Sequence, residues 1–219
     1  MIGRSLGVGI KVKVIFYSMY GHTYRLAVAV VEGAAEVENT RVEMLQVAEL
    51  VPENILEKTG AKRARELFAH IPVAKPDDMV DADAIIFGAP TRYGNMCSQM
   101  RSFIDQTGSL WAKNAFVGKV GSAFTSSSTQ HGGQETTLIT CYISLLHLGM
   151  IIVGLPYSEV RQMTMSEITG GSPYGTSSIS GSGGSRMPSD NELAMARFQG
   201  KHVATIASRL VSAPMMVKV

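Results

Sequence analysis

The chain has 219 residues, of which 45% are hydrophobic, so it is long enough and apolar enough for one α/β domain with a large core. Its formal net charge of +2, without a dense block of Lys or Arg, argues against a surface that binds nucleic acid directly. Two cysteines are too few for a disulfide scaffold or a metal cluster, and no run approaches the roughly 18 to 20 apolar residues of a membrane span, so we expect a cytoplasmic protein without a metal.

The first expected element is a strand that runs directly into a hydroxyl-rich turn. An apolar run at residues 12–17 predicts the strand, and a helical pattern follows over residues 24–36. The turn between them, residues 18–23, reads Ser-Met-Tyr-Gly-His-Thr. Free N–H groups and the positive end of a helix dipole favour an anion at such a turn, and hydroxyl groups complete its coordination. The sequence therefore predicts a phosphorylated ligand near residue 20.

Further apolar runs predict four more strands. The runs at residues 84–88 and 150–155 are almost continuously apolar, which is typical of parallel strands covered by helices on both faces. The four strands are expected at residues 41–47, 84–88, 119–125 and 150–155.

Helical patterns lie between and after these strands, at residues 96–107, 134–149 and 192–210. Gly108 follows the first of them and is expected to be its C-terminal cap. The alternation of strands and helices predicts a doubly wound parallel sheet.

Two segments are too long for simple connections. Residues 48–83 are rich in charge, and within them residues 53–69 predict one or two short amphipathic helices. Residues 156–188 contain a Gly/Ser-rich run at 170–185. Only one helix follows this run, so we expect a long surface loop rather than a linker between domains. Such a loop is either a functional lid or contact or a disordered segment, and both alternatives stay open.

Three loops with unusual chemistry follow three of the predicted strands. They are residues 18–23, 90–95 and 126–135. Each alone could be a structural turn, because Ser, Thr, Asn and Gly cap helices and tolerate tight backbones. Together they would meet at the carboxyl edge of a parallel sheet, where ligands bind at the point of reversal in strand order. This combination favours a ligand site.

Several motifs, in the same order along the chain, are shared with one family. They are Ser-Met-Tyr-Gly-His-Thr, Gly-Ala-Pro-Thr-Arg-Tyr-Gly-Asn-Met, Phe-Ile-Asp-Gln-Thr-Gly-Ser-Leu-Trp and His-Gly-Gly-Gln-Glu-Thr-Thr, then Gly-Gly-Ser-Pro-Tyr-Gly and Ala-Arg-Phe-Gln-Gly. Over roughly residues 11–211 the sequence resembles the WrbA-type NAD(P)H:quinone oxidoreductases, which are flavodoxin-like FMN proteins.

The resemblance implies a flavodoxin-like fold, with five parallel strands in the order 2-1-3-4-5 and helices on both faces. One FMN-binding domain would span residues 11–212, between a loose N-terminal tip at 1–10 and a tail at 213–219. The resemblance, together with the two long segments, also implies a homotetramer built from dimers.

The resemblance further implies which residues hold FMN. The first loop would hold the phosphate, the second would flank the isoalloxazine ring, and the third would hold the ribityl chain and the other side of the ring. The implied cofactor-binding residues are Ser18, Met19, Tyr20, Gly21, His22, Thr23, Thr91, Arg92, Tyr93, Ser126, Ser127, Ser128, Thr129, Gln130, His131, Gly132 and His147.

Tyr20 and Trp111 match family residues at the nicotinamide and quinone site. A single tryptophan is more often a core residue, but the position of Trp111 after a helix-terminating turn favours an aromatic ring that lies beside an open flavin face.

His131 and His147 are the catalytic candidates. His131 could relay a proton to reduced quinone, and a solvated loop residue is the equal alternative. His147 ends an apolar helix, and the family match makes it a flavin-site residue supplied across a subunit interface.

The predicted function is that of an FMN-dependent NAD(P)H:quinone oxidoreductase. NADH or NADPH and the quinone would use one flavin face in turn, which predicts two-electron ping-pong kinetics. One alternative is a flavodoxin-type electron carrier, which the balance of 20 Lys and Arg against 18 Asp and Glu disfavours because such carriers rely on an acidic surface. The other is a regulatory flavoprotein that binds protein partners.

Overall fold

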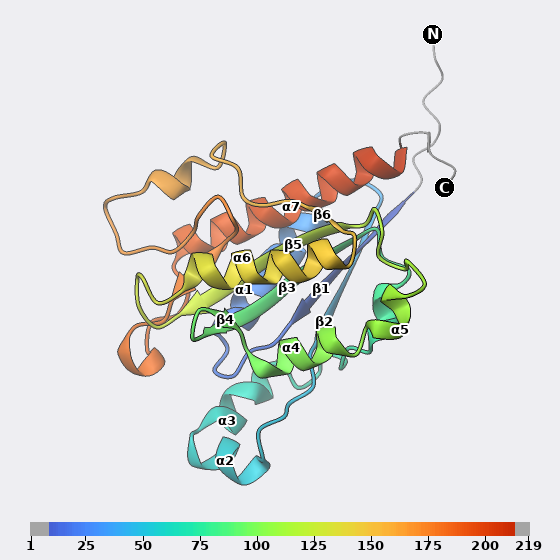
Figure 1. The fold of residues 1–219 in the computed structure, drawn as a ribbon. Coiled ribbons are helices and arrows are strands. Elements are labelled where there is room, and N and C mark those ends of the chain that lie inside the picture. Colours follow the sequence, from blue (N-terminus) through green and yellow to red (C-terminus); the bar gives the residue numbers. More distant parts are fainter. Residues whose placement is uncertain (1–8, 213–219) are drawn as a thin grey trace.

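The structure, a computed structural model, describes residues 9–212 of the chain (Figure 1). In chain order its elements are β1 (Ile10–Phe16), α1 (His22–Ala35), β2 (Thr40–Gln46), α2 (Glu53–Lys58), α3 (Ala61–Arg65), η1 (Glu66–Phe68), η2 (Pro76–Met79), β3 (Ala84–Arg92), β4 (Asn95–Met96), α4 (Ser98–Asp105), α5 (Gly108–Trp111), β5 (Val120–Ser127), α6 (Gln134–His147), β6 (Ile151–Ile152), η3 (Val160–Met163), β7 (Ser177–Ile179), η4 (Ser182–Gly184) and α7 (Asp190–Ser212).

The sheet is built on five parallel strands in the order β2-β1-β3-β5-β6. Counted along this path the order is 2-1-3-4-5, so the predicted flavodoxin-like topology is confirmed. Two short strands extend it to seven: β4 pairs antiparallel with the end of β3, and β7 pairs parallel with the end of β5.

Helices cover both faces of the sheet, as predicted. α4 and α6 lie on one face, and α1 and α7 lie on the other (Figure 1). Because side chains alternate along a strand, Ile15 and Tyr17 enter the core under α4 and α6, whereas Val14 and Phe16 enter the core under α1 and α7. This double burial explains why the predicted strand at residues 84–88, which is part of β3, reads as a continuous apolar run.

Two glycines allow α1 and α7 to pack closely. A Cβ added to Gly33 of α1 would lie 1.7 Å from the carbonyl oxygen of Arg197, and one added to Gly200 of α7 would lie 2.0 Å from that of Val30. Neither position can hold a larger residue without separating the helices. This contact packs the second half of α1 directly against α7.

The fifth strand position differs from the prediction. The expected strand at residues 150–155 is reduced to β6, and β7 continues the same edge further along β5. The two pieces are separated because a turn at Ser172 to Gly175 lies against Gly154, whose added Cβ would be 2.3 Å from Pro173 O. Residues 156–188 are therefore not only a surface loop, since Ser177 and Ser178 are fully buried.

Several element boundaries also differ from the predictions. α1 begins at His22, two residues earlier than expected, and Met96 belongs to β4 rather than to the following helix. Gly108 is not a C-terminal cap but the first residue of α5, because the chain turns directly into another short helix. The predicted short helices in residues 53–69 are confirmed by α2, α3 and η1.

Within residues 9–212, no helix combines the length and the apolar character needed to cross a bilayer. The predicted tip and tail fall mainly on residues 1–8 and 213–219, which lie outside the described residues, while Ile10 already belongs to β1.

Candidate active site

A cleft of about 500 Å³ lies at the carboxyl ends of β1, β3, β5 and β7. Its volume is within the range of about 300–1,000 Å³ that is common for small-molecule sites. The three predicted loops and both long segments contribute to its wall. The lining residues are Ser18, Met19, Tyr20, His22, Thr23, Thr59, Pro90, Thr91, Arg92, Ser126, Ser127, Ser128, Ser180, Gly183 and Gly184.

The first loop ends in Gly21, which caps α1. Its φ of 94° lies in the left-handed region that glycine adopts without strain, and its N–H donates to Ser18 Oγ at 3.1 Å. Because α1 begins at His22, Thr23 lies in the first helical turn, and its Oγ1 is 3.1 Å from Ser126 Oγ of the third loop. Hydroxyl groups and the N-terminus of α1 therefore meet at one end of the cleft, as anion binding requires.

His22 is buried beside this end of the cleft. Its Nε2 donates to Gly184 O at 2.9 Å, since a carbonyl oxygen can only accept. Burial lowers the pKa of His22, although the hydrogen bond to Gly184 acts in the opposite direction. A neutral imidazole follows, so this side chain adds hydrogen bonding rather than charge to the first loop.

The second loop is a tight hairpin between β3 and β4. Thr91 and Arg92 line the cleft, whereas Tyr93 occupies the tip, with a φ of 53° and a fully exposed side chain. Arg92 Nη1 donates to Thr91 O at 2.9 Å, which leaves its guanidinium at the cleft rim near Met19. Thr91 Oγ1 lies 2.7 Å from Thr137 Oγ1 of α6, and this contact holds the hairpin against the helix.

The third loop divides between two cavities. Ser126, Ser127 and Ser128 line the cleft, while Gln130 and His131 line a separate cavity of about 600 Å³ beside residues 164–171. The turn is held by its own main chain. Ser127 Oγ donates to Thr129 O at 2.7 Å, and Gly132 N–H donates to the same oxygen at 3.3 Å.

Trp111 and His147 lie together but away from the cleft. Trp111 Nε1 donates to His147 O at 3.0 Å, and both residues line another cavity between α4, α5 and α6. His147 is at the C-terminal end of α6, next to Gly149, whose carbonyl oxygen accepts from Gly118 N–H just before β5 begins. These two predicted site residues are therefore at the amino edge of the sheet, opposite the cleft of the same chain.

Comparison with known sequences identifies the family. A sequence profile described as "NADPH-dependent FMN reductase" matches residues 11–163. A protein of Aromatoleum aromaticum named "NAD(P)H dehydrogenase (quinone)" is 63% identical over 201 residues, which cover 92% of this chain and 97% of that protein. A protein of Methanosarcina acetivorans with the same name is 62% identical, covering 92% and 98% of the two chains. The chain belongs to the NADPH-dependent FMN reductase family.

Within that family, the predicted resemblance to the WrbA-type proteins is confirmed. A solved structure described as a flavodoxin, WrbA-like protein from Agrobacterium tumefaciens has 25% sequence identity and a TM-score of 0.62, covering 92% of this chain and 99% of that one. An archaeal flavodoxin has a TM-score of 0.58 at 21% identity, with 90% and 99% covered, and it shows the shared fold.

In this FMN reductase family member, both long segments contribute residues to the wall of the cleft. The sequence analysis did not predict these residues. Thr59, at the end of α2, comes from residues 48–83, and Ser180, Gly183 and Gly184 come from residues 156–188. The one available signal was the Gly/Ser-rich composition of residues 170–185, which permits a main chain to approach a ligand closely.

A half-buried polar network supports the first loop from residues 48–83. Arg65 Nη1 donates to Ser18 O at 2.9 Å and pairs with Glu49 at 3.0 Å. Glu49 also accepts from Tyr17 Oη at 3.0 Å and from Gln99 Nε2 at 2.9 Å. A side chain from α3 thereby holds the main chain of the first loop in place.

The electrostatics of this network favour an ionised Glu49. Burial acts to raise the pKa of Glu49, but hydrogen bonds from Val51 N–H, Gln99 and Tyr17, with the charge of Arg65, lower it overall. Burial, followed by the charge of Glu49, raises the pKa of Tyr17, so its phenol keeps the proton that it donates. The Arg65 guanidinium is thus already paired, and its donation to Ser18 O positions the loop.

Cys97, at the start of α4, is buried, and burial raises the pKa of its thiol to about 11. A thiol that stays protonated near neutral pH is a poor nucleophile. We therefore expect Cys97 to be an unreactive side chain.

Proposed function

We propose that the protein is an FMN-dependent NAD(P)H:quinone oxidoreductase that reduces quinones to hydroquinones by two electrons. The observation that supports this most strongly is the cleft itself, which joins the hydroxyl-rich N-terminus of α1 to the ends of β3 and β5. The relatives at 62% and 63% identity are named for this reaction.

The residues of the cleft fit FMN. At one end, Ser18, Thr23 and Ser126 place hydroxyl groups beside the first turn of α1, which suits a phosphate without requiring a Lys or Arg. At the other end, Thr91 and Arg92 stand where backbone N–H groups and a positive charge suit the polar edge of a flavin ring. We assign the phosphate to residues 18–23, the ring to 91–93 and the ribityl chain to 126–132.

When bound, FMN supplies the redox chemistry, taking a hydride equivalent from NADH or NADPH and passing two electrons to a quinone. The protein contributes position and surroundings. Tyr20 is 40% exposed on the cleft wall, where its ring can pack against a nicotinamide or a quinone. Arg92 keeps a positive charge at the rim that both substrates must pass.

His131 is assigned as a proton donor to the reduced quinone. Its loop continues directly from the cleft-lining Ser126, Ser127 and Ser128, and its ring is exposed. Imidazole is the commonest side chain in general acid–base catalysis, which suits this role.

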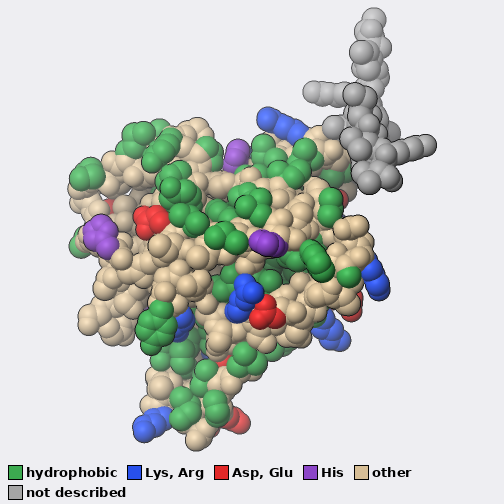
Figure 2. Space-filling view, in the orientation of Figure 1, with side chains coloured by type: hydrophobic (Ala, Val, Ile, Leu, Met, Phe, Trp, Pro, Cys, Tyr) green, Lys and Arg blue, Asp and Glu red, His purple; other side chains and the backbone are tan. Residues whose placement is uncertain are grey.

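We assign Trp111 and His147 to the cleft of a neighbouring subunit in a homotetramer. α6 has an exposed apolar face formed by Ile139, Ile143 and Leu146, and hydrophobic side chains gather over this helix in Figure 2. Trp111, 57% exposed beside this face, is likewise available to a second copy. Light scattering at several concentrations tests the assembly. A monomer at every concentration would contradict both the tetramer and the role of these two residues.

A visible spectrum of the purified protein tests the function directly. An FMN spectrum should bleach with NADH or NADPH without oxygen and recover on addition of benzoquinone. Initial rates should give parallel double-reciprocal lines, because both substrates use one face in turn. Intersecting lines would contradict the ping-pong order, and a strongly stabilised semiquinone would favour an electron carrier instead.

The phosphate assignment has a matched pair of variants. Thr23→Val keeps the shape of the side chain and removes its hydroxyl, so the Kd for FMN should rise by about tenfold or more, as expected for a hydrogen bond to a charged group. Thr205→Val makes the same change at a half-buried position of α7 outside the cleft and should leave the Kd unchanged.

A further inference from the structure

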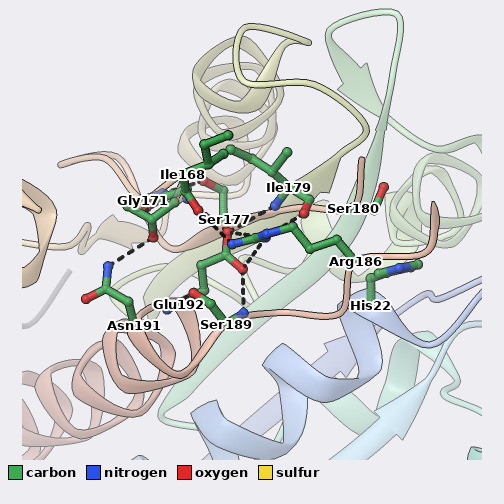
Figure 3. Close-up of polar contacts among 12 residues, drawn as sticks. His22, Ile168, Gly171, Ser177, Ile179, Ser180, Arg186, Ser189, Asn191 and Glu192 are labelled. Atoms are coloured by element: carbon green, nitrogen blue, oxygen red, sulfur yellow. Dashed lines mark hydrogen bonds and ion pairs between the residues drawn. The ribbon is translucent and has the colours of Figure 1, made fainter. Parts of the chain in front are cut away.

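Residues 180–188, which we call the strap, connect β7 to α7 along the carboxyl edge of the sheet. Ser180, Gly183 and Gly184 of the strap line the same cleft as the first and third loops. Figure 3 shows Ser180, Arg186 and the neighbouring His22, which lie on one side of the Glu192 cluster.

The strap is fastened at both ends of the hydroxyl-rich part of the cleft. Ser180 N–H donates to Ser127 O at 2.8 Å, and its Oγ lies 3.2 Å from the same oxygen. Gly184 O accepts from His22 Nε2 at 2.9 Å. One fastening is therefore on the end of β5 and the other is in the first turn of α1, so the strap bridges the two elements that would flank the phosphate.

A buried ion pair fixes the position of the strap. The Glu192 carboxylate is fully buried and pairs with Arg186 Nη1 at 3.0 Å. It also accepts from the N–H groups of Gly170, Ile179 and Ser189, at 2.9, 3.1 and 2.8 Å. Figure 3 labels Ile179 and Ser189 beside Glu192. Movement of the strap would take Arg186 away from this buried carboxylate and leave it only its backbone N–H donors, which is costly for a buried charge.

Arg186 ties the same cluster to the main chain of residues 156–188. It donates to Ile179 O at 2.6 Å and to Ile168 O at 2.7 Å. Its planar guanidinium makes these bonds in fixed directions, which an ammonium group cannot reproduce. Arg186 is therefore the side chain that sets the distance between the strap and β7.

The turn of the strap is compact because three glycines adopt positive φ angles. These are 74° at Gly181, 76° at Gly183 and 71° at Gly184. With no side chains at these positions, the main chain itself forms the wall of the cleft. A wall of main chain held at both ends gives little room for a ligand to continue past it.

We propose that the strap is a specificity element, which accepts a flavin that ends in a phosphate monoester and rejects one that continues beyond that phosphate. This inference rests on the proposed binding of FMN in the cleft. In the proposed binding mode, FMN would end at its phosphate, beside Thr23 and Ser126. FAD continues through a second phosphate to adenosine, and this part would have to pass between His22 and Gly184 and break their hydrogen bond.

The first test compares binding of FMN, FAD and riboflavin to the flavin-free protein, measured by quenching of flavin fluorescence. The wild type should bind FMN at least about a hundredfold more tightly than FAD or riboflavin. Arg186→Ala should narrow the preference for FMN over FAD by about tenfold or more, and Arg186→Lys should restore only part of it. Arg197→Ala, which removes another Arg–Glu pair of α7, should leave the preference unchanged.

The second test uses hydrogen exchange of the wild type, so it does not depend on the folding of a variant. Exchange of residues 180–188 should slow when FMN binds and should stay unchanged with riboflavin, which lacks the phosphate. Equal binding of FMN and FAD by the wild type, or an exchange rate that FMN does not alter, would overturn the role of the strap. A wild type that binds no flavin at all would instead contradict the proposed function.

Discussion

The two long segments support the same end of the cleft in different ways. Residues 48–83 act through side chains, since Arg65 of α3 donates to Ser18 O and is held by Glu49. Residues 156–188 act mainly through main chain, since Gly184 O accepts from His22 and Ser180 N–H donates to Ser127 O. The first contribution can be changed by one substitution, whereas the second depends on the packing of a whole segment around Glu192.

The two supports also differ in how deeply their carboxylates are buried, which determines how much each contributes to stability. Glu192 is fully buried and collects hydrogen bonds from several parts of the chain, while Glu49 keeps 15% of its side chain exposed. We therefore expect the strap to be the costlier of the two supports to break. Breaking the support from residues 48–83 should lower the free energy of unfolding by less.

The largest expected effect is that of Glu192→Ala. Removal of this carboxylate leaves Arg186 and three backbone N–H groups without their buried acceptor, and the free energy of unfolding should fall by about 3–5 kcal/mol. Urea unfolding followed by circular dichroism measures this loss. Glu36→Ala removes the partner of Lys201 from an exposed pair and should cost at most about 1 kcal/mol. An equal loss in both variants would contradict the comparison.

Arg65→Ala should have a smaller effect on stability. Glu49 keeps its hydrogen bonds from Tyr17 and Gln99, so we expect the free energy of unfolding to fall by about 1–3 kcal/mol. The Kd for FMN should also rise, because Ser18 O loses the donor that positions the first loop. Arg63→Ala on the same helix, where the side chain is exposed, is the control. If both variants bind FMN alike, Arg65 does not position the loop.

The two supports should also differ in their response to pH. Burial lowers the pKa of His22, so the unfolded chain takes up its proton first, and stability should fall as pH drops below 6.5 towards the lowered value. The pKa of Glu49 is also lowered, so its contribution is present above pH 4.5 and is lost as the pH falls through the folded value. As the pH falls, the stability contribution of His22, which holds the strap, should thus be lost at a higher pH than that of Glu49, which holds Arg65.

Unfolding of His22→Gln at pH 7.5 and pH 5.5 measures this difference. The variant should show a smaller loss of stability between the two pH values than the wild type. His202→Gln is a necessary comparison, because burial and the charge of Arg209 lower the pKa of His202 as well. If the wild-type loss of stability between pH 7.5 and pH 5.5 remains in His22→Gln and disappears in His202→Gln, the pH dependence comes from His202 on α7 and not from His22.

Lys62→Ala should have the smallest effect. Lys62 pairs with Glu53 and Glu57 in exposed positions on residues 48–83, and such pairs are screened by water and salt. The denaturation midpoint and the Kd for FMN should both stay unchanged. A clear shift of either would mean that the outer surface of this segment supports the cleft as well as Arg65 does.

The parts of the fold that the sequence predicted are those with a strong local signal. β3 begins as a continuous apolar run, β1 and β5 are likewise buried along most of their length, and the first loop combines a strand end, a glycine and hydroxyl groups. Periodicity and turn chemistry record such features directly. The three loops consequently contributed Ser18, Thr91 and Ser126 to one cleft, as the order of the strands required.

The parts that were missed depend on residues far apart in the chain. β7 has three residues, two of them serines, and it exists because it pairs with β5 and because Gln199 accepts from Thr176 N–H at 2.7 Å. Neither contact leaves a local pattern. Trp111 and His147 lie at the other edge of the sheet from the cleft of the same chain, so their role at a flavin stays a prediction that involves a second copy of the chain.

The divided fifth strand has a further consequence for association. A long, straight outer strand would offer an uninterrupted row of backbone N–H and C=O groups to another sheet. Here the edge consists of β6 with two residues and β7 with three, separated by residues 153–176. Edge-to-edge growth of the sheet is therefore restricted on this side, so the proposed association of copies would have to use other surfaces, such as the exposed helix face of α6.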